Sequence, residues 1–74
     1  MTHTSAVTVG HNVRAEMTRH QFSQERIGAI IGVSQSGVSR RLLGDIAFDV
    51  VELTTLAHLF GVPASHLLGE SAAA

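Results

Sequence analysis

Residues 22–43, FSQERIGAIIGVSQSGVSRRLL, contain two helix starts that follow each other closely. The stretch opens with Ser23, which lies between two apolar residues, Phe22 and Ile27. A serine at a helix N-cap accepts a hydrogen bond from a free amide of the first turn. Apolar residues just before the cap and four positions after it pack together as a hydrophobic staple. We therefore predict a helix over about residues 24–31.

The same pattern follows at once. Ser34 lies between Val33 and Val38, which predicts another helix over about residues 35–43. Only three residues, beginning with Gly32, join the two helices. Because glycine readily adopts positive φ, so short a joint fixes two helices at a steep angle. This is the geometry of a helix-turn-helix, in which the amino end of the second helix meets the base edges of DNA.

A third staple lies further along the chain. Phe48 and Leu53 flank Asp49, and Asp49 with Glu52 has the spacing of a capping box. These residues predict a helix that ends at Phe60. Apolar residues recur at helical spacing within it, which predicts an inner face of Leu53, Leu56, Ala57 and Phe60.

Two further helices complete the domain. Val13 and Met17, one turn apart, predict a first helix over about residues 9–20 with these side chains inward. Pro63 opens a short last helix over residues 64–68, since proline is favoured where a helix begins. The pattern is therefore that of an all-α, five-helix fold.

Length and composition suit one small domain. We expect a flexible segment at 1–8, a helix-turn-helix domain over 9–70 and a disordered tail at 71–74. Of the 74 residues 45% are apolar, enough for a core, and none is cysteine, which excludes disulfides and thiolate metal sites. No apolar run approaches the roughly 18 residues of a membrane span. We expect a cytoplasmic protein.

Charge is divided unevenly along the chain. Five arginines against two glutamates give residues 1–44 a net charge of +3, whereas four acids without lysine or arginine give residues 45–74 a net charge of −4. The front half is therefore suited to a nucleic acid, although a chance split of the charges explains the same numbers.

The second helix of the joint carries polar side chains on one side, opposite Val38 and Leu42. Glutamine can bond the edge of adenine in a bidentate manner, and arginine can do the same to guanine. We interpret these side chains as base-reading residues: Gln35, Ser36, Ser39 and Arg40. The alternative is a polar face that only keeps the helix soluble.

Phosphate contacts are expected beside this helix. Gln24 lies in the first turn of the preceding helix, where free amides and the helix dipole favour a phosphate. Weaker candidates are Ser23, Ser34, Arg19, Arg26 and Arg41. Arg26 is equally explained by an ordinary exposed helix pair.

Residues 23–40 resemble the helix-turn-helix of the phage repressor and Cro-like family, also called the XRE family. Residues 56–63 and 66–68 are similar to its fourth and fifth helices, so the resemblance covers about residues 9–70. It implies a five-helix, lambda-repressor-like DNA-binding domain that commonly acts as a dimer on a near-palindromic operator. It also implies the roles of Gln24 toward phosphate and of Gln35, Ser36 and Arg40 toward bases.

The chain departs from the family at several positions. Met17 and Leu42 occupy the places of a buried arginine and glutamate, so an apolar contact is expected instead. Arg41 occupies a usually apolar place, where it either snorkels or reaches a phosphate. The loop at 45–48, often basic in the family, carries no cation. Gly28 replaces a common alanine and permits closer helix contact.

Enzymatic and metal-binding functions find no support in the sequence. The five histidines include no pair three or four residues apart, and we expect no cysteine or acidic partner for them at ligand spacing. Catalytic triads, paired catalytic carboxylates and phosphate-binding glycine loops are missing. We therefore expect no enzyme, no cofactor, no metal and no small-molecule ligand.

The predicted function is that of a transcriptional regulator binding double-stranded operator DNA. The type expected is a phage Cro or immunity repressor that occludes a promoter, working in the bacterial host cytoplasm if phage-encoded. A homodimer could use Ile46, Phe48, Leu59 and the end of the last helix, although each is equally explained as core. The alternative is a protein-binding adaptor of antirepressor or antitoxin-like kind.

Overall fold

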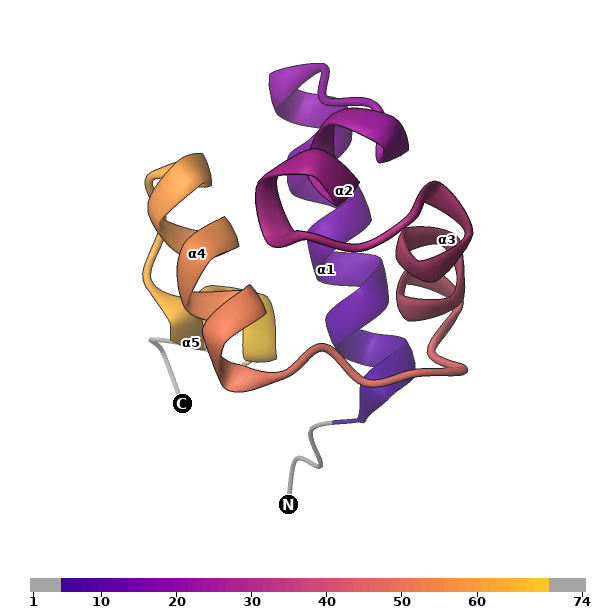
Figure 1. The fold of residues 1–74 in the computed structure, drawn as a ribbon. Helices are drawn as coiled ribbons and strands as arrows, with labels where there is room; N and C mark the ends of the chain where they lie inside the picture. Colours follow the sequence, from indigo (N-terminus) through magenta and orange to yellow (C-terminus); the bar gives the residue numbers. More distant parts are fainter. Residues whose placement is uncertain (1–4, 70–74) are drawn as a thin grey trace.

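The computed structural model describes residues 5–69, which form five helices and no strand (Figure 1). Their bounds are α1 Ala6–His20, α2 Gln24–Ile31, α3 Gln35–Leu43, α4 Val50–Phe60 and α5 Ala64–Leu68. The all-α, five-helix prediction is therefore confirmed, and four of the five helices have the predicted bounds.

The helix starts follow the capping residues read from the sequence. The Ser23 and Ser34 hydroxyls accept hydrogen bonds from amides in the first turns of α2 and α3. At α4, the Asp49 carboxylate accepts from the amide of Glu52, while the Glu52 carboxylate accepts from the amide of Asp49. This reciprocal capping box was predicted, and it is confirmed.

The prediction for α1 was wrong at its amino end, because the helix begins at Ala6 and not near Val9. The cap is Ser5, whose hydroxyl accepts from the amide of Thr8 at 3.1 Å. Residues 5–8, which were expected within a flexible segment at 1–8, instead form this cap and the start of α1. Residues 1–4 and the expected tail at 71–74 lie outside the described residues.

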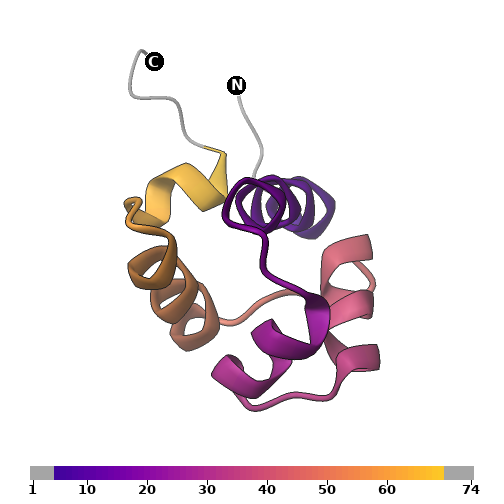
Figure 2. The ribbon, with the colours of Figure 1, turned by 90° about the horizontal axis from the view of Figure 1, so that it is seen from above.

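Helix α1 is the central element of the fold. Figure 2 shows α2 and α3 on one side of α1, and α4 and α5 on the other. Helix α3 packs against α1 and α2, while α4 packs closely against α5 and more lightly against α1 and α2. This arrangement leaves α3 at the edge of the molecule, with one side against the body and one side outward (Figure 1).

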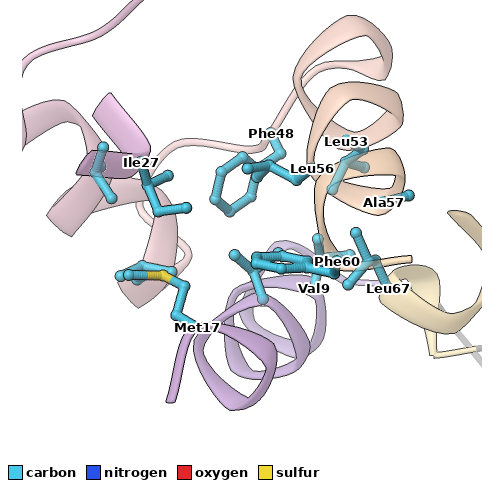
Figure 3. Packing of buried hydrophobic residues seen from close by; sticks show 12 residues of the cluster. Val9, Met17, Ile27, Phe48, Leu53, Leu56, Ala57, Phe60 and Leu67 are labelled. Carbon is cyan, nitrogen blue, oxygen red and sulfur yellow. The ribbon is translucent and has the colours of Figure 1, made fainter. Parts of the chain in front are cut away.

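All five helices contribute to a single hydrophobic core (Figure 3). The residues predicted to face inward from α1, α3 and α4 are all buried, among them Val13, Val38 and Leu56, which are fully inaccessible. Phe48, in the loop before α4, is also buried. Burial of such side chains is the main favourable term in folding, at about 25 cal/mol per Å² of apolar surface.

A buried carboxylate ties α5 to α1. Glu16 is only 2% exposed, and its Oε2 atom lies 3.1 Å from Nε2 of His66. Nε2 of His20 lies 3.5 Å from the other carboxylate oxygen, and the mostly exposed Arg19 is 3.9 Å away. The expectation that the histidines have no nearby acidic partner was therefore wrong: Glu16 precedes His20 by four residues and meets His66 through the fold.

Replacing His66 by alanine should lower the free energy of unfolding by about 1–3 kcal/mol, because it removes a polar partner of a buried carboxylate. His58→Ala is the matched control, since His58 is an exposed histidine of α4. Chemical denaturation of the two variants measures the difference. Equal losses in both variants would contradict the structural role of the Glu16–His66 contact.

Candidate nucleic-acid interface

The joint between α2 and α3 is built around Gly28. Its carbonyl oxygen accepts hydrogen bonds from the amides of both Gly32, at 2.8 Å, and Val33, at 2.9 Å. Gly32 adopts the left-handed conformation, with φ at 78°. The chain therefore turns within three residues, and Ser34 caps α3 directly after the turn.

Gly28 also allows this turn to lie close to α2. A Cβ atom at this position would lie 2.5 Å from the carbonyl oxygen of Val33. The sequence had suggested that Gly28 permits closer helix contact, and the structure specifies the contact as backbone of the joint itself. Gly28 is not among the glycines with positive φ, so it is the close approach of the Val33 carbonyl, and not the backbone conformation, that requires glycine here.

Gly28→Ala tests this close approach, because the two explanations predict opposite changes in the stability of the protein. Alanine is favoured over glycine in a helix by about 1 kcal/mol, so helix propensity alone predicts a more stable protein. We expect a less stable one, because the added methyl group displaces the joint. Thermal unfolding monitored by circular dichroism gives the sign.

Ala29→Gly, at an exposed position of the same helix, calibrates the propensity effect in the opposite direction. It should destabilise the protein by about 1 kcal/mol. A Gly28→Ala variant with a raised melting temperature would show that the joint has room for a side chain.

The base-reading candidates form one surface. Gln35, Ser36, Ser39 and Arg40 of α3 line an open hollow of about 440 Å³ together with Gln24 of α2. Gln35, Ser36 and Arg40 are exposed, while Ser39 and Gln24 are half-buried. The opposite side of α3 faces the core through Val38 and Leu42. The structure thus brings together every residue predicted to read bases and the first-ranked phosphate candidate.

Ser23 and Arg26 lie in a neighbouring hollow of about 400 Å³, at the turn between α1 and α2. It is lined by them with His20, Gln21 and Phe22. The Ser23 hydroxyl accepts from the amide of Arg26, which leaves its own proton available for donation. Within the described part of the chain, Arg26 has no ion-pair partner.

Ser34, the cap of α3, and Ser36, in its first turn, are hydrogen-bonded to each other. Ser34 Oγ accepts from the amide of Gly37 at 3.1 Å and also lies 3.1 Å from Ser36 Oγ. One of these two hydroxyls therefore donates to the other. The predicted cap role of Ser34 is confirmed, whereas Ser34 is not among the residues that line either hollow, and its phosphate contact stays a prediction.

Arg41 does not take either of the arrangements expected for it. Its Nε and Nη2 atoms donate to the two carboxylate oxygens of Glu52, at 3.0 and 3.2 Å. Its Nη1 atom donates to the carbonyl of Gly37 at 3.0 Å. The half-buried guanidinium is therefore paired with protein groups in this structure, in place of the snorkelling or phosphate contact that the sequence predicted.

Glu52 was recognised in the sequence only as a capping residue. Its pairing with Arg41 joins positions 11 residues apart, and no local pattern signals such a pair. By contrast, Met17 and Leu42 are both buried in the hydrophobic core, in keeping with the expected apolar replacement of the family's ion pair. The chain thus carries a buried ion pair at a different place.

Residues 5–69 contain no cluster of three or more side chains suited to holding a metal ion. No helix in the same span is long and apolar enough to cross a membrane. What distinguishes this surface is therefore its row of amide, hydroxyl and guanidinium groups. Such groups recognise a ligand by hydrogen bonding.

A three-residue joint between two helices, with polar groups exposed along the second, defines a helix-turn-helix domain. The chain belongs to the BetR domain family, whose model matches residues 4–74. It is also similar to the crystal structure of the restriction-modification controller protein C.AhdI from Aeromonas hydrophila, with a TM-score of 0.73 and 24% sequence identity. The similarity covers 84% of this chain and 94% of that chain, and it confirms the helix-turn-helix fold. No curated protein matches the chain.

Proposed function

We propose that this protein is a small transcriptional regulator that binds double-stranded DNA in a sequence-specific manner. The observation that carries the proposal is the surface formed by Gln24 and four polar residues of α3. A helix that is exposed along one side and supported on the other can enter the major groove. The similarity to a controller protein supports the same class of function.

In this proposal α3 supplies the base contacts. Gln35, at the first position of the helix, reads adenine through its amide, and Arg40 reads guanine through its guanidinium. Ser36 and Ser39 are short, which allows the backbone of α3 to approach the base edges. Their hydroxyl groups can also bond to either kind of base.

Phosphate contacts come from the groups around the hollow. The side chain of Gln24 and the free amides of the first turn of α2 face one phosphate, as at other helix amino ends. Ser23 and Arg26 extend this contact, with Ser34 and Arg19 as further donors. Arg41 is left out, because Glu52 already neutralises its charge.

The biological form of the regulator is a phage-type Cro or immunity repressor that occludes a promoter in the bacterial host cytoplasm. Support comes from the resemblance of residues 23–40 to that family. A homodimer on a near-palindromic operator would place half-sites about one helical turn apart. Of the residues expected at the dimer contact, Phe48 belongs to the core and Leu59 packs against it, whereas Ile46 is 38% exposed.

An exposed apolar surface favours a second candidate function, that of a protein-binding adaptor. Val50 and Val51 begin α4 and are 78% and 73% exposed. Neighbouring apolar side chains that are both exposed can form part of a contact with another protein. The polar hollow would then serve another protein and not a duplex.

Arg40→Ala tests the proposed function. The variant should lose about 1–3 kcal/mol of affinity for a duplex that the wild-type chain selects from a random pool. It should also accept any base at the position that Arg40 reads. Fluorescence anisotropy and a repeated selection measure the two effects.

Arg14→Ala is the matched control, because Arg14 is an exposed arginine of α1 that lines neither hollow. The logarithm of the wild-type affinity should fall linearly with the logarithm of the salt concentration, as expected for phosphate binding. Binding that ignores both salt and the Arg40 substitution would instead favour the adaptor.

A further inference from the structure

We propose that Arg41 and Glu52 act as a positioning pair, which sets the orientation of α3, the helix that reads DNA under the proposed function. Under this inference Arg41 touches no part of the duplex. It holds the neighbouring residues of α3 in register with the base edges, and Glu52 is the anchor on α4.

The pair has the geometry that best defines an orientation. Two parallel hydrogen bonds, Nε to Oε1 at 3.0 Å and Nη2 to Oε2 at 3.2 Å, join the planar guanidinium to the carboxylate. The side chains are only 16% and 10% exposed. Bidentate pairs of this kind combine strength with directional specificity, and burial reduces screening by salt.

Both ends of the pair are fixed to backbone. Arg41 donates through Nη1 to the carbonyl of Gly37, one turn earlier in α3. Glu52 accepts from the amide of Asp49 and thereby belongs to the capping box of α4. The bridge therefore runs from the backbone of α3 to the first turn of α4, with little freedom in either side chain.

The other described contacts of α3 with neighbouring helices are packing contacts. Helix α3 packs closely against α1 and α2, but α4 is not among its close neighbours in the described part of the chain. Val38 and Leu42 hold its inner side by apolar contact, which is non-directional. The Arg41–Glu52 pair is the hydrogen-bonded link from α3 to α4, and it resists rotation of α3 about its own axis.

Such a rotation would matter for base reading. Arg40 directly precedes Arg41, and successive residues of a helix are separated by about 100° around its axis. With Arg41 directed toward Glu52, Arg40 lies on the exposed side that lines the hollow. A rotation of α3 that turns Arg41 away from Glu52 therefore moves Arg40, Ser36 and Ser39 relative to any duplex.

Glu52→Gln tests the pair with the smallest change in shape. The ratio of binding to the selected duplex over binding to the unselected pool should fall by about tenfold, as expected when two coupled residues are separated. The slope of log affinity against log salt should stay unchanged, because no phosphate contact is lost. The full-length chain is used throughout.

Asp45→Asn is the charge-matched control, since it removes one negative charge from an exposed position in the loop between α3 and α4. It should leave the binding ratio unchanged. An equal fall in the binding ratio for both variants would overturn the inference, as would tighter binding by Glu52→Gln. Tighter binding with a steeper salt slope would mean that a freed Arg41 contacts phosphate.

Arg41→Gln completes a double-variant cycle. If the residues act as one unit, Arg41→Gln lowers the binding ratio about as much as Glu52→Gln, and the double variant loses little more. A direct phosphate contact by Arg41 predicts a different result: the salt slope falls by about 1 with or without Glu52.

A further variant separates positioning from stability. Replacing both residues by methionine exchanges a buried ion pair for apolar side chains of similar length, which often leaves stability intact. We expect a folded protein by circular dichroism with a lowered binding ratio. If the Arg41→Met/Glu52→Met variant is folded and has the wild-type binding ratio, the positioning role is overturned while the proposed function stands. If the wild-type chain binds no duplex, both the proposed function and the positioning role are overturned.

Discussion

The close approach of Gly28 to the backbone of the following turn is the constraint on which the interface depends. Two successive amides bind its carbonyl oxygen, and the space beside its Cα atom is taken by the Val33 carbonyl. This contact fixes where α2 ends and in which direction the chain leaves it. The place where α3 begins follows from that direction.

The rest of the molecule supports the same joint from behind. Helix α1 packs directly against α3 and α5, and α2 and α4 close the other side of the core through their own contact (Figure 2). Burial of Val38 and Leu42 places one side of α3 against the core. The opposite side can therefore be polar and exposed without exposing the core. One side of α3 thus belongs to the core, and its other side carries the candidate site.

Local signals made most of the fold predictable. A staple and an N-cap, such as Phe22 with Ser23, act over one helical turn, so the sequence shows them directly. The grouping of Ser36 with Ser39 and Arg40 was also predictable, because residues three and four apart lie on one side of a helix. The start of α1 was not, since Ser5 lacks an apolar pattern to mark it as the cap.

Contacts between distant residues could not be inferred in this way. Glu16 meets His66 only because α5 folds back onto α1, across 50 positions of sequence. Arg41 finds Glu52 only because the loop after α3 returns the chain to the core at Phe48. In the sequence, nothing distinguishes these four residues as partners from other charged or polar residues. Only the tertiary fold gives these residues their partners.

The buried guanidinium–carboxylate bridge also constrains how this domain can evolve. Loss of either charge alone leaves the other unpaired in a poorly hydrated site, which lowers stability, whereas loss of both often leaves stability intact. Viable substitutions at the two positions are therefore epistatic. Related chains with this fold should therefore keep both charged residues or replace both together.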